Sequence, residues 1–192
     1  AVVLGIACSP DRMGLPIWAG IGVCLGAGLI GGLFNGLLVS KAKIPSIIVT
    51  LGMLTILRGV TELLMGGKWI ENMPAALRQF GTGSFSGVPY SIWVALGIVL
   101  AGIWITKRTK FGLRVFAIGS NPEAAVLRGI PSTRIRIGIF SLTGLSCGVA
   151  ALFGATQLQV IESGFGSGFE LIVIASVIVG GTSIRGGRGS VL

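Results

Sequence analysis

The residues able to do covalent chemistry in this sequence are few, and none forms a catalytic pattern. Histidine is absent, which removes the commonest general base and metal ligand. The three cysteines, Cys8, Cys24 and Cys147, each stand in an apolar run without CxxC spacing or companion ligands. Such cysteines are typical of small core residues. We therefore assign no catalytic residue and no metal site.

Polar side chains inside apolar runs are the remaining candidates for function. Arg58 and Glu62 are four residues apart, so a helix would place them on one face, where they could form an ion pair. Four uncharged residues could hydrogen bond either a polar solute on its path or a neighbouring helix. These candidate path residues are Asn35, Thr50, Gln157 and Gln159.

The composition indicates the kind of element that holds these residues. Hydrophobic residues make up 52% and charged residues 11% of the chain, whereas an ordinary globular domain is about 25% charged. The mean hydropathy is +0.92. A net charge of +9 could suggest nucleic-acid binding, but the basic residues lie in short connectors between apolar runs. This placement is typical of cytoplasmic anchors of a membrane protein.

Several apolar runs approach the twenty or so residues that cross a bilayer. The expected spans are Leu15–Ser40, Ile44–Met65, Tyr90–Thr106 and Ile137–Leu158, with the tail of another at residues 1–8. Residues 169–184 are apolar but bounded by glycines, which suits a re-entrant or broken helix as well as a full crossing. We predict an all-α polytopic membrane protein whose residues 1–192 form one transmembrane domain. We expect it to be a fragment that lacks spans at both ends.

Basic residues alternate between the connectors, as the positive-inside rule requires. One set of basic residues comprises Lys41, Lys43, those of residues 107–136, Arg185 and Arg188, and the other comprises Arg12, Lys68 and Arg78. The richer set marks the cytoplasmic side. Residues 107–136 are then a cytoplasmic loop, and residues 66–89 face the periplasm.

The segment GSNPEAAVLRGI, residues 119–130, predicts a short helix with a capping residue at its start and a terminating glycine at its end. Asn121 suits the N-cap, Pro122 the first helical position and Glu123 the first turn. Gly129 suits the position just past the helix. A capped helix in a cytoplasmic loop between two spans favours a docking partner.

The EAA-xxx-G spacing of this helix resembles the coupling loop of ABC-importer permeases. The stretches FNGLLVSKAKIPSIIVTLGMLTILRG (34–59), FGLRVFAIGSNPEAA (111–125) and GGTSIRGGRGS (180–190) look like the ribose-type monosaccharide permease family. The usual importer loop continues into an apolar-Pro signature that IPSTRIRIGIF does not reproduce. GGKWIENMPAAL (66–77) resembles permeases for autoinducer-2 and rhamnose more than the ribose member.

The resemblance implies a non-enzymatic permease subunit of the bacterial inner membrane, translocating a monosaccharide or a sugar-like signal. It implies that Glu123, Ala124, Ala125 and Gly129 couple the chain to an ATPase. The chain contains no phosphate-binding P-loop, so ATP and Mg²⁺ are expected on that separate ATPase. The other implied partners are a second permease subunit, identical or not, a periplasmic sugar-binding protein and membrane lipid, with no nucleic acid.

Two other classes of protein share part of this pattern. An ion-coupled secondary transporter would also be apolar, glycine-rich and positive inside, but it would not need a capped cytoplasmic helix. An intramembrane enzyme would need a histidine, paired aspartates or a serine with a base, and the sequence offers no such arrangement.

Overall fold

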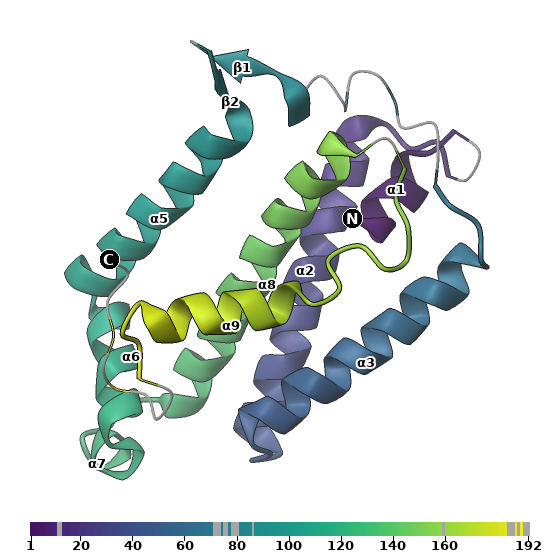
Figure 1. Cartoon of the computed structure of the whole chain (residues 1–192). Coiled ribbons are helices and arrows are strands. Elements are labelled where there is room, and N and C mark those ends of the chain that lie inside the picture. Colours follow the sequence, from purple (N-terminus) through teal and green to yellow (C-terminus); the bar gives the residue numbers. More distant parts are fainter. Residues whose placement is uncertain are drawn as a thin grey trace. The chain divides into compact units, whose positions relative to one another are not determined.

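The structure is a computed structural model that describes residues 1–10, 13–70, 74, 77, 81–85, 87–158, 160–183, 187 and 189. It is mostly helical, which confirms the predicted fold class (Figure 1). The helices are α1 (Val2–Cys8), α2 (Ile17–Lys41), α3 (Ser46–Met65), α5 (Tyr90–Arg108), α6 (Lys110–Ser120), α7 (Pro122–Leu127), α8 (Ser132–Gln157) and α9 (Phe169–Val179). The strands are β1 (Ser84–Phe85) and β2 (Val88–Pro89).

Four of the described helices are long and apolar enough to cross a membrane, namely α2, α3, α5 and α8. They correspond to the four complete spans expected from the sequence. The largest difference is at the start of α8, which begins at Ser132 instead of Ile137. Arg134 and Arg136 lower the hydropathy of this first turn without preventing helix formation, so an apolar run underestimates the length of the helix.

The chain divides into two compact units, of which the first holds residues 1–93 and 137–165. In this unit α1 and α3 both pack against α2. Figure 1 shows α2 and α3 meeting at the short connector between them. The hairpin of β1 and β2 turns at Gly87, whose φ is +80°, and pairs Phe85 with Val88.

A row of glycines joins α2 to α8 inside the first unit. A Cβ added at Gly28 would lie 2.5 Å from the carbonyl oxygen of Gly144, and one added at Gly32 would meet the carbonyl oxygen of Phe140. At Gly36 it would lie 2.9 Å from the Cα of Ile137. The two backbones are therefore in direct contact, and only glycine permits this approach. We call this contact the glycine seam.

The first unit also holds the most deeply buried side chains of the described residues. Leu4, Leu77 and Ile161 are fully buried. Ile70 and Ile161 exchange backbone hydrogen bonds of 3.1 and 3.0 Å, which tie the segment after α3 to the segment after α8. The apolar surfaces of the spans themselves remain largely uncovered, as expected for helices that face lipid or further spans.

The second unit holds residues 94–136 and 166–192, and it contains α6, α7, α9 and most of α5. α9 has 11 residues, so it is about 16 Å long and covers about half of the hydrocarbon thickness. Its end is well defined, because Gly181 has a φ of +82° and the Thr182 amide donates to the Val177 carbonyl at 3.2 Å. This geometry agrees with the broken-helix alternative for residues 169–184.

Candidate functional site

The connector between α5 and α8 is largely helical, and its helices follow one another with single-residue junctions. Thr109 alone separates α5 from α6, and Asn121 alone separates α6 from α7. The Thr109 hydroxyl donates to the Ile105 carbonyl and accepts the Gly112 amide at 3.2 Å. A Cβ at Gly112 would lie 2.5 Å from the Ile105 carbonyl oxygen, so α6 starts directly against the last turn of α5.

The start of α7 has the predicted capping geometry. The Asn121 side chain accepts the backbone N–H of Ala124 at 3.0 Å, and Pro122 occupies the first turn. Glu123 places a carboxylate in the same turn, near the positive end of the helix dipole. The predicted N-cap is therefore confirmed.

The end of α7 is a Schellman motif centred on Gly129. The φ of Gly129 is +73°. Its amide donates to the Val126 carbonyl at 2.9 Å, and the Ile130 amide donates to the Ala125 carbonyl at 3.0 Å. Both bonds satisfy carbonyls that the helix end would leave unpaired. Gly129 is therefore the terminator that the sequence predicted.

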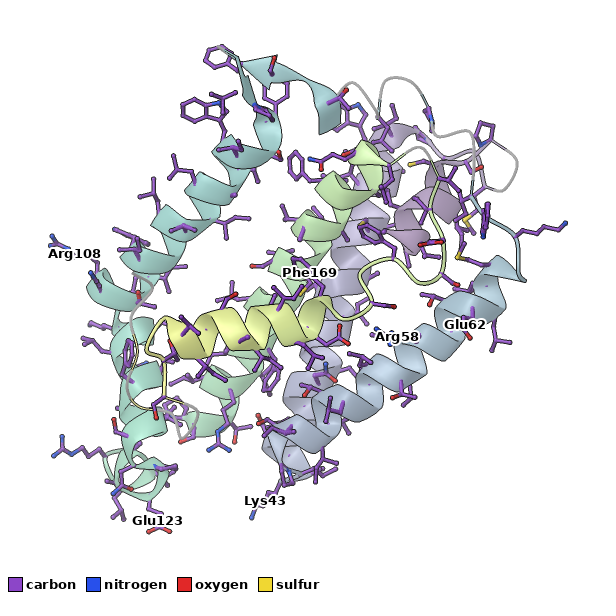
Figure 2. The ribbon with its side chains drawn as sticks, viewed as in Figure 1. Lys43, Arg58, Glu62, Arg108, Glu123 and Phe169 are labelled. Carbon is purple, nitrogen blue, oxygen red and sulfur yellow. The ribbon has the colours of Figure 1, made fainter. Side chains whose placement is uncertain are left out.

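The most exposed apolar side chains of α7 are not the alanines that were predicted to couple the chain to an ATPase. Ala125 is buried, with 3% of its surface exposed, and Ala124 is half-buried. Val126 and Leu127 are instead 59% and 89% exposed. Glu123 lies in the first turn of α7, and Figure 2 shows its side chain directed away from α6. The coupling prediction rested on a family motif, which contains the alanines but neither Val126 nor Leu127.

The candidate path residues do not form one cluster. Asn35 lies on α2 near Gly36, which faces Ile137 of α8. Gln157 is the last residue of α8, so it lies roughly 30 Å along that helix from Ile137. Gln159 lies outside the described residues. These residues stay separate predictions.

Two of these residues also differ in how their polar atoms are satisfied. The Thr50 hydroxyl donates within its own helix, to the carbonyls of Ser46 and Ile47 at 3.0 and 3.1 Å. The Asn35 Oδ1 atom is buried, and the described residues supply no hydrogen-bond partner for it. Of the two, Asn35 has the stronger need of a polar neighbour.

Arg58 and Glu62 both lie on α3, and the continuous helix places them on the same face (Figure 2). Both residues are exposed in this structure. Arg58 lies seven residues before Met65 at the end of α3, which is about 10 Å along the axis. The pair thus belongs to the outer part of the predicted span, and the ion pair itself stays a prediction.

Within each unit, connectors predicted to lie on the same side of the membrane contact each other. Ile70 pairs with Ile161, and both belong to connectors predicted to be periplasmic. The Ser120 hydroxyl donates to the Gly187 carbonyl at 3.4 Å, and both belong to segments predicted to be cytoplasmic. Four basic residues of the charge pattern lie outside the described residues: Arg12, Arg78, Arg185 and Arg188.

No cluster of histidine, cysteine, aspartate or glutamate that could hold a metal ion occurs in the part of the chain that the structure describes. The features that distinguish the site are therefore the four apolar spans, the glycine seam and α7. Together they indicate a multi-spanning membrane protein with a short capped helix between two of its spans.

Residues 1–190 match the family model described as the permease component of branched-chain amino acid transport systems. The chain belongs to this permease family. This match confirms two predictions from the sequence, namely the ABC-importer permease family and the location in a membrane as a multi-pass protein.

Among individual relatives, the chain is similar to autoinducer 2 import system permease proteins LsrC. The Klebsiella pneumoniae protein is 41% identical over 165 residues, which are 86% of this chain and 48% of that protein. The Salmonella paratyphi B protein is 37% identical over 195 residues, covering 100% of this chain and 55% of that protein. The Yersinia pseudotuberculosis protein is 37% identical over 186 residues, covering 94% and 53% respectively. The chain thus spans about half the length of the curated relatives it matches, and no solved structure matches it.

Proposed function

We propose that this chain is the core of a permease subunit of an ABC importer that carries a small sugar-like solute inward. ATP and Mg²⁺ bind a separate ATPase in this proposal. The other partners are a second permease subunit, a periplasmic solute-binding protein and the surrounding lipid. The chain itself provides the membrane path and performs no covalent chemistry.

The observation that carries the proposal is α7. A six-residue helix is too short to be stable alone in water, yet this helix has a side-chain cap at its start and a Schellman motif at its end. It presents Val126 and Leu127 outward in a connector rich in basic residues. Exposed apolar side chains on a fixed helix are suited to a groove on another protein.

The similar proteins support the choice of solute class. The relatives named above are described as import permeases for autoinducer 2. The family description names amino acids instead, so family membership alone does not fix the solute. Identity of 37–41% over most of this chain favours the sugar-like signal, with ribose and rhamnose as the neighbouring candidates.

The test uses the full-length permease with its second subunit, its solute-binding protein and its ATPase. Leu127→Asp places a charge where the proposal puts an apolar contact with the groove of the ATPase. We expect ATPase co-purification and autoinducer-2 uptake to fall about tenfold or more. Leu113→Asp is the matched control, because Leu113 on α6 is 66% exposed and lies in the same connector. It should leave both measurements near the parent value.

A second comparison isolates the backbone at the end of α7. Gly129→Val forces a β-branched residue into the left-handed region, at a cost of about 1–2 kcal/mol or more, whereas Gly129→Asn tolerates that region. Val should weaken ATPase association and Asn should largely preserve it. Normal uptake by both Leu127→Asp and Gly129→Val, or uptake that needs no ATPase, would overturn the proposal and favour an ion-coupled transporter.

A further inference from the structure

One face of α3 carries polar groups and glycines, and the opposite face is apolar. The polar face of α3 consists of Gly52, Thr55, Arg58, Gly59 and Glu62, which a helix places in one strip. The apolar face consists of Met53, Leu57, Val60 and Leu64. Such a division inside a span indicates that the two faces meet different surroundings.

Lipid is a poor environment for the polar face. A charged side chain in the hydrocarbon costs at least about 2.5–3.5 kcal/mol at the centre of a span, so such residues face water or protein. Arg58 is seven residues from the end of α3 and Glu62 is three. Both charges therefore turn toward an aqueous or protein-lined space in the outer part of the membrane.

The glycines of the polar face differ from those of the glycine seam in their described surroundings. In the glycine seam, a Cβ added at Gly28, Gly32 or Gly36 would collide with the backbone of α8. A Cβ added at Gly52 or Gly59 would meet no described residue within 4 Å. A helix packed onto this face would also have to replace the hydration of Arg58 and Glu62, which costs several kcal/mol for each ion.

We infer that the polar face of α3 lines the outer part of a water-filled path and contacts the solute there. This inference rests on the proposed function. Arg58 offers N–H donors and Glu62 offers acceptors, a combination that matches the vicinal hydroxyl groups of a small polyhydroxylated solute. The Thr55 hydroxyl already donates to the Leu51 carbonyl at 3.1 Å, so toward the path its oxygen acts as an acceptor. Gly52 and Gly59 leave room beside these groups.

The experiment measures which face of α3 meets water. It uses the full-length complex in membranes, with Cys8, Cys24 and Cys147 replaced by serine or alanine. Thr55→Cys and Gly59→Cys sample the polar face, and Met53→Cys and Val60→Cys are matched controls on the apolar face. The probe is a charged, membrane-impermeant methanethiosulfonate reagent, which reacts with ionised thiols and therefore needs water at the site.

We expect the two polar-face cysteines to react about tenfold or more faster than the two controls, because thiols in lipid stay protonated. Saturating autoinducer-2 with the binding protein, or ribose in a parallel assay, should slow the polar-face reaction. Slow reaction at all four positions would show that α3 packs against another helix there. Equal reaction on both faces would show that the path does not follow this face, and either result overturns the inference.

The labelling result for α3 can be distinguished from the test of the proposed function. ATP-dependent uptake by the cysteine-free parent reports on the importer assignment regardless of the labelling pattern. Normal uptake with slow labelling at all four positions rejects only the assignment of α3. Loss of ATP dependence with fast polar-face labelling rejects only the coupling to an ATPase.

Discussion

The glycine seam and α3 are both apolar, glycine-bearing parts of the same unit, yet they use glycine differently. In the seam, glycines bring the backbones of α2 and α8 into contact. On α3, no other part of the described chain lies against Gly52 or Gly59, and charged residues share their face. The position of a glycine in a span therefore does not reveal its role. What lies opposite the missing Cβ decides whether glycine provides packing or room.

The greatest loss of stability is predicted for Gly32→Ala. The added methyl group would meet the Phe140 carbonyl oxygen, so α2 and α8 must separate or shift. Overpacking of this kind costs about 1–3 kcal/mol, and we expect the midpoint of thermal unfolding of the full-length protein in detergent to fall by several degrees. Gly31→Ala is the matched control, because a Cβ there meets none of the residues that the structure describes within 4 Å. Equal midpoints for the two variants would contradict the seam.

A smaller effect is expected for Arg58→Gln and Glu62→Gln. If the polar face of α3 meets water, the pair is worth only about 0.3–0.5 kcal/mol, and less in this order because the basic residue precedes the acidic one. Each variant should keep its thermal midpoint and raise the KM for uptake severalfold. Strong loss of protein from membranes with either single variant, and recovery with the double variant, would show instead a buried pair against another segment.

The smallest loss of stability is expected for Gly59→Ala. The described surroundings leave space for the methyl group, and alanine improves helix propensity by about 1 kcal/mol. We expect an unchanged or slightly higher thermal midpoint, opposite in sign to that of Gly32→Ala. A decrease as large as that of Gly32→Ala would mean that another helix uses Gly59 as α8 uses Gly32.

The sequence predicted the elements that depend on local chemistry. The four spans follow from apolar runs, and both ends of α7 follow from Asn121, Pro122 and Gly129. The sequence did not predict α6. The Thr109 cap that accepts the Gly112 amide is local, but the close approach of Gly112 to the last turn of α5 is not visible in a linear pattern. Likewise, nothing in a linear pattern shows that Gly32 meets Phe140 or that Ala125 is buried while Leu127 is exposed. Such facts depend on the packing of segments far apart along the chain or on the orientation of one helix.

The single-residue junctions on either side of α6 determine how the connector responds when α7 is displaced. Between the end of α5 and the start of α7, only Thr109 and Asn121 lie outside helices, and each is fixed by a side-chain hydrogen bond. Each residue contributes only two soft backbone dihedrals, so this part of the chain has little slack. We therefore expect α5, α6 and α7 to move together, so that a displacement of α7 also displaces α5. A flexible linker would instead change its own conformation and leave α5 in place.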